Sequence, residues 1–517
     1  MLRAGEHLAW RTQTRLDPIG LTPMAIHRRS PPCALVIFGA SGDLTRRKLL
    51  PALRQLASEE RLGAEFALIG VARTEISDGG FRELARSGDG ASSAEWEGIL
   101  AHASYVAGDY DDPATYRRLA ALLEESDATI GTSGNRVFYL AIPPQLFGTV
   151  ARQLGAAGLS HGAGEGFARL VIEKPFGWDE DSARVLYAEI STSFREEQIF
   201  RIDHYLAKET VQNLLAMRFA TTVFEPMWNR TWVDNVQITV AETIGVGERG
   251  GFYEGTGAVR DIVQNHVLQV LSLLLMEAPA SFHPEAIRDE KLKLLRAIRP
   301  LGEDEDIDTC AVRGQYARGG SHGNPIPAYR EESGVDPVSQ TETFVAMRLN
   351  VNNWRWAGVP VYVRTGKRLA RRVTEVAMEF KQPPQLPFLP AGDRASCPDA
   401  LIVRIFPDEG LSLEFGAKVP GHEFNIRQAS MDFRYSTEAE GHGAEAYERV
   451  LLDALVGDPT LFVRADEVGR AWRIVDPLLE AWAKCTDPIP LYQAATWGPR
   501  EASDLLSRDG RRWRLSS

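Results

Sequence analysis

Residues 33–57, CALVIFGASGDLTRRKLLPALRQLA, decide the fold of the first part of this chain. A short apolar run, CALVIF, is followed by the glycine-rich turn GASGDLT and then by leucines at helical spacing. A strand, a tight loop and a helix in this order open a βαβ unit. The stretch therefore predicts the first strand and helix of a Rossmann-type nucleotide-binding domain.

Further apolar runs follow at regular intervals, with helical stretches between them. They read FALIGVAR at 66–73, SYVAGDY at 104–110, VFYLAIPP at 137–144 and ARLVIEKPFG at 168–177. Apolar strands that alternate with helices are typical of a parallel sheet covered on both faces. We predict an α/β dinucleotide-binding domain over residues 34–205.

The pattern changes in the second part of the chain. Alternating or β-rich runs appear over 232–243, 339–353, 359–367, 373–381, 399–407 and 411–418, and helical runs over 259–279, 444–457 and 471–484. Such runs favour an antiparallel sheet with one packed face. We predict an α+β domain with a large, mainly antiparallel sheet over residues 206–517, which serves substrate binding and oligomerisation. Residues 1–33 read as a poorly ordered polar tail.

Composition narrows the class of protein. The chain has 517 residues, 44% hydrophobic and 25% charged, with a net charge of −12. These values are typical of a globular enzyme and argue against nucleic acid or an anionic membrane as the main partner. The four cysteines show no C-x-x-C spacing and no apolar run reaches eighteen residues, so we expect a cytoplasmic protein with no metal site and no membrane span.

The turn GASGDLT is the first candidate binding site. Its glycines allow the backbone to approach a pyrophosphate, although their spacing departs from G-x-G-x-x-G. The second strand ends with Arg73 and Thr74, and an arginine at this place can meet a 2′-phosphate. We therefore favour NADP, with NAD as the second choice. The alternative is that Arg73 is a plain surface arginine.

Two polar motifs follow the last strands of the first domain. EKPFG places Lys174 at a strand end, where ligands bind in such folds. RIDHYLAKE, at 201–209, follows at the domain boundary. If it opens a helix, His204 and Lys208 share one face and can hold a phosphate, while Asp203 is free to orient another group. A solvated helix face is the alternative.

A third motif, VRDIVQNHVLQV at 259–270, places Asp261 and His266 on a mostly apolar helix. A histidine is a suitable base near neutral pH, and a carboxylate such as Asp203 could fix its tautomer. A buried structural histidine is the alternative.

Taken in order, GASGDL, EKPFG, RIDHYLAKE, RDIVQNH and RTGKRL closely resemble the glucose-6-phosphate dehydrogenase family, from about residue 34 onward. The resemblance implies oxidation of glucose 6-phosphate at C1, with hydride transfer to NADP⁺. It also implies that His266 is the general base, that Asp203 pairs with it, and that the Lys174–Pro175 bond is cis.

The resemblance further assigns the binding residues. The sugar 6-phosphate would be held by three residues of RIDHYLAKE, namely His204, Tyr205 and Lys208. The rest of the substrate would be contacted by Glu242, Asp261, Lys367, Arg372 and Lys174. The cofactor would be lined by Gly39, Ala40, Ser41, Gly42, Asp43, Leu44, Thr45, Arg73, Asp109 and Tyr110, with Lys174 reaching both ligands.

Two expectations and two rival readings complete the prediction. Val373 stands where some members of the family have a lysine for a second nucleotide, so we expect none here, and the family suggests a homodimer or homotetramer. The rivals are another NAD(P)-dependent sugar oxidoreductase and a non-catalytic scaffold homologue. The basic residues of the predicted site argue against an uncharged sugar as the substrate. The presence of Asp203 and His266 argues against a catalytically inactive homologue.

Overall fold

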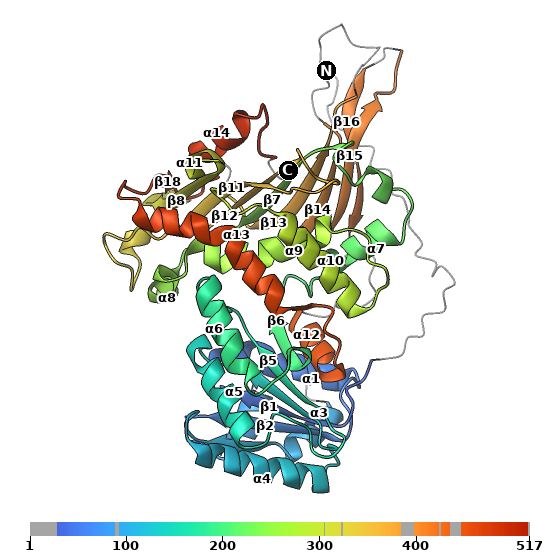
Figure 1. Ribbon diagram of the computed structural model, residues 1–517, viewed down its shortest axis with the longest axis vertical. Helices are drawn as coiled ribbons and strands as arrows, with labels where there is room; N and C mark the ends of the chain where they lie inside the picture. The colour runs from blue at the N-terminus through green and yellow to red at the C-terminus, as the bar shows by residue number, and fades with distance from the viewer. Residues whose placement is uncertain are drawn as a thin grey trace, which may run out of the picture.

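The computed structural model describes residues 28–87, 93–303, 305–321, 324–383, 398–422, 425–434 and 446–514. Most of the predicted tail, residues 1–27, lies outside the described residues. Figure 1 shows two stacked parts, a smaller α/β part and a larger part built on an extended sheet. The two predicted sheet types are therefore both present.

Seven strands form the first sheet in the order β17-β6-β5-β4-β1-β2-β3. All neighbours pair in parallel except β17 and β6. The predicted parallel sheet is confirmed. The strands are β1 (Cys33–Phe38), β2 (Phe66–Ala72), β3 (Ser104–Ala107), β4 (Arg136–Leu140), β5 (Ala168–Ile172), β6 (Ile199–Ile202) and β17 (Phe462–Val463).

Both faces of this sheet are covered, as its buried strands require. All six residues of β1 are buried, and alternate residues enter two different apolar clusters. One face packs against α4 (Pro113–Thr129), α5 (Phe147–Ala156) and α6 (Glu180–Ser191). The other packs against α1 (Leu50–Ser58), α2 (Asp78–Arg86), α3 (Ala94–Ala101) and α12 (Ala446–Val456).

Nine strands form the second sheet in the order β16-β15-β14-β13-β7-β12-β11-β8-β18. Only β7–β12 and β8–β18 are parallel pairs in it, so the predicted mainly antiparallel sheet is confirmed. Its strands are β7 (Val233–Ala241), β8 (Ala311–Ala317), β11 (Phe344–Asn350), β12 (Pro360–Gly366), β13 (Val373–Phe380), β14 (Ala400–Phe406), β15 (Gly410–Lys418), β16 (Ile426–Arg434) and β18 (Leu491–Gln493). A small hairpin pairs β9 (Gly319–Ser321) with β10 (Asn324–Ile326).

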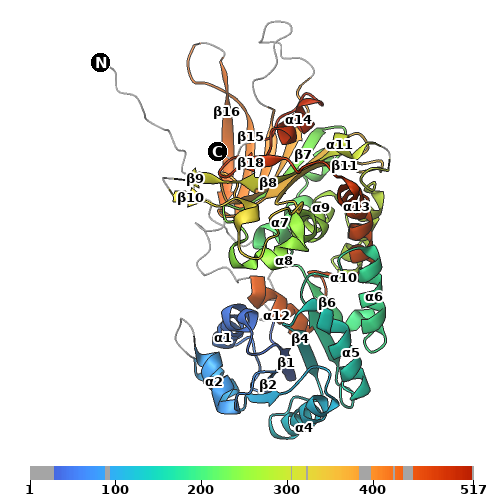
Figure 2. The ribbon, with the colours of Figure 1, turned by 90° about the vertical axis from the view of Figure 1, so that its left-hand side faces the viewer.

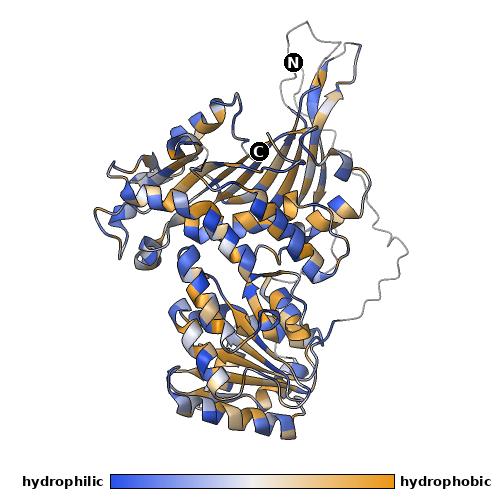
Figure 3. Ribbon diagram, viewed as in Figure 1, coloured by the Kyte–Doolittle hydropathy of each residue, from blue (hydrophilic) through white to orange (hydrophobic). Residues whose placement is uncertain are grey.

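Helices fill the space between the second sheet and the first part (Figures 1 and 2). Figure 3 shows apolar residues concentrated on the central one, α9, and every residue of α9 is buried. The larger helices here are α7 (Glu209–Phe219), α9 (Leu268–Leu275), α10 (Pro284–Ala297) and α13 (Ala465–Lys484). The shorter α8 (Gly250–Glu254), α11 (Ile307–Cys310) and α14 (Glu501–Ser507) belong to the same part of the chain.

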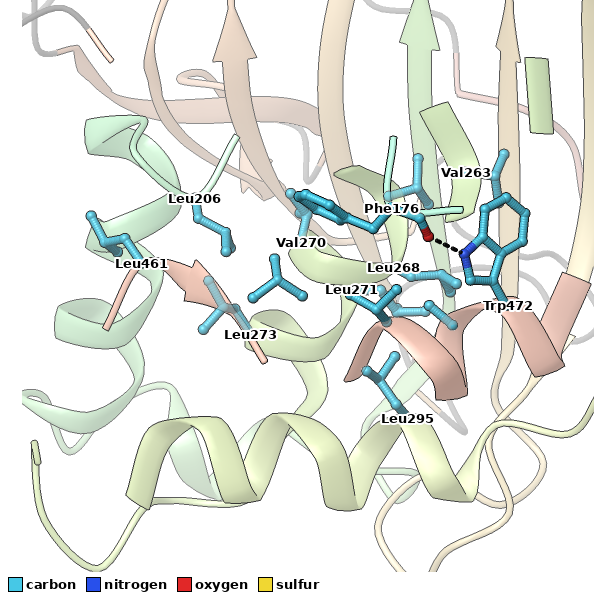
Figure 4. Close-up of a cluster of buried hydrophobic side chains, with 14 of the residues drawn as sticks. Phe176, Leu206, Val263, Leu268, Val270, Leu271, Leu273, Leu295, Leu461 and Trp472 are labelled. Atoms are coloured by element: carbon cyan, nitrogen blue, oxygen red, sulfur yellow. Dashed lines mark hydrogen bonds between the residues drawn. The ribbon is translucent and has the colours of Figure 1, made fainter. Parts of the chain in front are cut away.

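The end of the chain ties the two parts together. After β16, α12 packs on α1, and β17 adds an antiparallel strand to β6. Helix α13 then crosses back, and its Trp472 donates a 3.0 Å hydrogen bond to the carbonyl oxygen of Phe176 (Figure 4). Because Phe176 belongs to the EKPFG loop, this contact fixes that loop against the larger part of the protein.

Candidate active site

The candidate site begins at the carboxyl ends of two neighbouring strands. β5 is followed by the loop 173–177 and β6 by the turn 203–208. The strands pair in parallel, so both segments emerge at the same edge of the sheet. The Lys174–Pro175 bond is cis, as the family resemblance implies.

A wide helix faces these two segments. Residues Val259–Val267 form a π-helix, where the sequence predicted a regular helix, and the backbone N–H of Leu268 reaches the carbonyl oxygen of Val263. π-Helical turns pair residues five apart and are frequent at functional sites. Asp261 and His266 are five apart, so the wide turn places them on one side of the helix.

His266 and Asp203 form the central pair of the site. Nδ1 of His266 lies 2.7 Å from Oδ1 of Asp203, and the same oxygen accepts the backbone N–H of Tyr205 at 2.9 Å. The Tyr205 ring stacks on the imidazole at a centroid distance of 4.3 Å. Since Asp203 accepts a hydrogen bond at Nδ1, the imidazole keeps its proton there and its Nε2 atom is available as a base.

Burial and charge set the protonation states of this pair. Burial is the largest influence on His266 and lowers its pKa below the ordinary 6.5, although Asp203 acts in the opposite direction. Burial also acts to raise the pKa of Asp203, but the charge and hydrogen bond of His266 and the Tyr205 N–H hold it below its usual range. A neutral imidazole beside an ionised carboxylate suits general-base catalysis.

Two lysines and two carboxylates alternate beside this pair. Nζ of Lys174 donates to the carbonyl oxygen of Asp261 at 2.7 Å and to its Oδ1 at 3.1 Å. Nζ of Lys367 donates to Oε2 of Glu242 at 2.5 Å and lies 4.0 Å from Oδ2 of Asp261. Burial acts to raise the pKa of Asp261, but the two lysines hold it below its usual range. Such alternating donors and acceptors match the hydroxyl groups of a sugar.

The segment after Asp203 differs from the prediction. Helix α7 begins only at Glu209, so His204 and Lys208 lie in a turn and do not share a helix face. Within the turn, the backbone N–H of Leu206 donates to the carbonyl oxygen of Asp203, and that of Lys208 to the carbonyl oxygen of Tyr205. Capping by the Asp203 carboxylate competes with helix formation, which is the physical reason for the difference.

Four neighbours of this turn were missed by the sequence analysis. Nε2 of His204 lies 3.2 Å from Oε2 of Glu173 and 3.1 Å from the Tyr447 hydroxyl, while Nζ of Lys208 lies 3.5 Å from Oε1 of Glu409. The fourth neighbour, Tyr139, reaches the same Glu173 carboxylate. Glu173 stands within EKPFG and could have been singled out, but no local signal marks the other three.

Arg372, which was predicted to contact the substrate, lies at the edge of the residues that surround the turn 203–208. It is exposed, and its guanidinium carbon lies 4.2 Å from the centroid of the Phe406 ring. Phe406 ends β14, and Glu409 follows in the next turn. The structure therefore places Arg372 beside the turn that reaches Lys208.

Apart from Lys174, which follows β5, the predicted cofactor residues lie at the carboxyl ends of β1, β2 and β3. Arg73 and Asp109 are exposed just beyond β2 and β3, and Tyr110 is buried. Burial is the largest influence on the pKa of Tyr110 and raises it. Ser41 contacts Thr74 at 2.9 Å, which ties the glycine-rich loop to the end of β2.

The glycine-rich loop fits a dinucleotide. It follows β1 next to β4, where the strand order reverses, which is where such folds bind nucleotides. Gly39 has φ +83°, and a Cβ there would lie 2.1 Å from the carbonyl oxygen of Ala141. Thr45 donates a 2.9 Å hydrogen bond back to the carbonyl oxygen of Gly39. Only glycine therefore fits at position 39, which keeps the turn tight between β1 and the helix that follows it.

The described part of the chain offers no candidate for a membrane span or for a metal centre. Among these residues, no helix has the length and apolar character needed to cross a membrane. The same residues hold no group of three or more His, Cys, Asp and Glu side chains arranged as metal ligands.

The fold and the site together define a class of protein. A Rossmann sheet with a glycine-rich loop at its switch point is a typical dinucleotide-binding fold, and the buried histidine–aspartate pair is suited to accept a proton. This combination is typical of dinucleotide-dependent oxidoreductases.

Comparison with known proteins gives the family. Residues 36–213 match the family model "Glucose-6-phosphate dehydrogenase, NAD binding domain", and residues 215–514 match "Glucose-6-phosphate dehydrogenase, C-terminal domain". The chain belongs to the glucose-6-phosphate dehydrogenase family.

Individual relatives are similar to this chain over nearly its whole length. The chain is 48% identical to the glucose-6-phosphate 1-dehydrogenase of Aggregatibacter actinomycetemcomitans over 489 residues, which cover 94% of this chain and 98% of that protein. It is 42% identical to that of Bacillus subtilis, with 94% and 99% covered. A solved glucose-6-phosphate dehydrogenase in complex with glucose 6-phosphate is 35% identical, with a TM-score of 0.86 and 94% and 99% covered.

Proposed function

We propose that this protein oxidises D-glucose 6-phosphate at C1 to 6-phospho-D-glucono-1,5-lactone, with NADP⁺ as hydride acceptor. This reaction is the first step of the oxidative pentose phosphate pathway. The observation that carries the proposal is the 2.7 Å contact between Nδ1 of His266 and Asp203, inside a cluster of lysines and carboxylates. The relatives named glucose-6-phosphate 1-dehydrogenase support it further.

His266 acts as the general base in this proposal. Its Nε2 takes the proton of the C1 hydroxyl, while Asp203 holds Nδ1 and stabilises the imidazolium that forms. General-base catalysis contributes about 10²–10⁴-fold to such reactions. The bound nicotinamide supplies the hydride acceptor. The Tyr205 ring covers one face of the imidazole and fixes its plane.

The other polar residues bind and orient the sugar. His204, Tyr205 and Lys208 hold the 6-phosphate, with Arg372 adding positive charge nearby. The sugar hydroxyls and C1 are positioned by Glu242, Asp261, Lys367 and Lys174. Because the phosphate is remote from C1, its binding energy serves to hold the sugar in the reactive geometry.

The preference proposed here for NADP over NAD is argued from the residues that follow β2. Arg73 is exposed there and free to meet a 2′-phosphate, and Thr74 is linked to the glycine-rich loop through Ser41. Asp109 and Tyr110 follow β3, which pairs in parallel with β2, so they emerge at the same edge of the sheet as Arg73. NAD remains the second candidate.

Three further proposals concern the whole protein. We place the main division between residues 34–205 and 206–517, with α12 and β17 returning to pack on the first domain. We also propose a homodimer or homotetramer. We propose a cytoplasmic enzyme because the spacing of its four cysteines in the sequence is not that of a disulfide framework.

Initial rates of nicotinamide reduction test the proposed function. The purified protein is given glucose 6-phosphate with NADP⁺ or NAD⁺ in parallel, and free glucose as the control substrate. We expect rapid NADP⁺ reduction that disappears with free glucose. Comparable rates with NAD⁺ would contradict the role given to Arg73, and no reduction with either cofactor would contradict the activity.

A further inference from the structure

Tyr253 is a buried aromatic residue that the proposed mechanism does not use. It lies in the short helix α8, just before the π-helix of the site, and is only 4% exposed. Nζ of Lys367 lies over its ring, 5.0 Å from the ring centroid. A cation within about 6 Å of the centroid is attracted by the negative face of an aromatic ring. The ring is therefore a third neighbour of the Lys367 ammonium, besides Glu242 and Asp261.

The Tyr253 ring is held by the larger part of the protein. It belongs to an apolar cluster in which the Tyr329 ring meets it edge-on, at a centroid distance of 6.1 Å. Its hydroxyl donates to the carbonyl oxygen of Glu342 at 3.5 Å, and the same oxygen accepts the backbone N–H of Ala258 at 3.0 Å. Since the π-helix begins directly after Ala258, these contacts tie the ring to the start of that helix.

The phenol of Tyr253 carries no charge. Burial is the largest influence on its pKa and raises it well above 10, and the carboxylates of Asp261, Glu342 and Glu242 act in the same direction. Any attraction between Tyr253 and a cation therefore comes from the face of the ring and not from a phenolate.

The position of the Lys367 ammonium depends on its neighbours, because lysine carries its charge on a flexible stem. Nζ donates to Oε2 of Glu242 at 2.5 Å and lies 4.0 Å from Oδ2 of Asp261. The Lys367 side chain is only 12% exposed, so little water separates the ammonium from the ring. Attraction between a cation and a ring is stronger when both are desolvated.

We propose that Tyr253 is a positioning residue whose ring face holds the Lys367 ammonium between Glu242 and Asp261. This inference rests on the proposed function, in which Lys367 and these two carboxylates bind the hydroxyl groups of the sugar. Without the attraction of the ring, the carboxylates alone set the position of the ammonium, and the donor that meets the sugar is displaced.

Fluorinated phenylalanines at position 253 test this inference, because fluorine withdraws electron density from the ring and changes its shape little. In Tyr253→Phe we expect kcat/KM for glucose 6-phosphate within about twofold of wild type, since the ring face remains and the lost hydroxyl contact is long. With mono-, di- and trifluorinated phenylalanine, kcat/KM should fall stepwise, by about three- to thirtyfold in total. The Kd of glucose 6-phosphate, measured by calorimetry without cofactor, should rise in the same proportion.

Two controls assign the effect to the contact between Tyr253 and Lys367. Phe344 belongs to the same apolar cluster, and its ring packs on Tyr492 at a centroid distance of 5.5 Å. The same fluorinated residues at position 344 should leave kcat/KM unchanged. In a Lys367→Met background, the fluorinated residues at position 253 should all give the same kcat/KM, because no ammonium remains over the ring.

The outcomes separate this inference from the proposed function. A purely structural role for Tyr253 would follow the shape of the side chain, so equal kcat/KM and equal Kd across the fluorinated series would overturn the inference. A stepwise fall that persists in Lys367→Met would overturn it as well. If the trifluorinated protein does not fold, the mono- and difluorinated proteins decide. A wild-type protein that does not oxidise glucose 6-phosphate would refute the proposed function, and the calorimetric series would still test the role of Tyr253.

Discussion

Replacing Asp203 with Asn tests the central pair of the site most directly. Oδ1 of Asp203 accepts from both Nδ1 of His266 and the N–H of Tyr205, and Oδ2 has no hydrogen-bond partner among the described residues. The amide oxygen of Asn can take the place of Oδ1, with its NH₂ group in the place of Oδ2. The tautomer of His266 is then kept, and the main loss is the negative charge.

The size of the expected loss in kcat follows from the missing negative charge. The carboxylate stabilises the imidazolium formed when His266 takes a proton, at about 4 Å between charge centres. With an effective dielectric constant of about 20 this is worth about 4 kcal/mol. A loss of that size corresponds to roughly a 10³-fold lower kcat, with the KM for glucose 6-phosphate changed little.

The pH profile provides a second measurement on the same variant. Activity requires the neutral imidazole, so it is lost as the pH falls through the lowered pKa of His266, and the acid limb of the wild-type profile should lie below pH 6.5. Asp203 acts to raise that pKa, so in Asp203→Asn the limb should move further to acid. A variant that keeps more than a tenth of wild-type kcat, or whose acid limb moves to higher pH, would refute this reasoning.

Four other substitutions have distinct expected results. His266→Asn should lower kcat about 10²–10⁴-fold with little change in substrate affinity, and near-normal turnover would remove His266 from its role. Lys208→Ala should raise the KM for glucose 6-phosphate more than tenfold and leave kcat nearly unchanged, which steady-state rates would reveal. Gly39→Ala should weaken NADP⁺ binding in calorimetry, because its φ is +83° and a Cβ would lie 2.1 Å from a backbone oxygen. Lys291→Met leaves the fully buried Glu467, 2.9 Å away, without a counter-charge and should cost about 3–5 kcal/mol; a thermal midpoint equal to wild type would contradict this.

Local sequence patterns were sufficient for the first sheet. The strand that begins at Cys33 is apolar on both faces and is followed by a glycine-rich turn, so its place in a buried parallel sheet follows from composition and period alone. The order of the short motifs along the chain identified Asp203, Lys174 and His266 as candidate site residues. Each of these lies in a short, unusual stretch, which is why a single sequence could single them out.

The conformation of two segments was decided by tertiary contacts. The turn 203–208 has a helical spacing of polar residues, yet the Asp203 carboxylate caps the backbone and is itself held by His266. Residues 259–267 have a regular apolar period, yet they form a π-helix in which Lys174 donates to the Asp261 carbonyl oxygen. Local periodicity does not contain the contacts of His266 with Asp203 and of Lys174 with Asp261, because these partners lie 63 and 87 positions apart along the chain.

Composition, hydrophobic period and motif order therefore predicted the fold class, the glycine-rich loop and the histidine–aspartate pair that we propose as the base and its carboxylate. Which side chains surround them depends on the tertiary fold: β17 joins β6 from about 260 positions later, Tyr447 reaches His204 and Glu409 reaches Lys208. Propensity and hydrophobic period are properties of neighbouring residues, whereas these pairings depend on how whole helices and sheets pack.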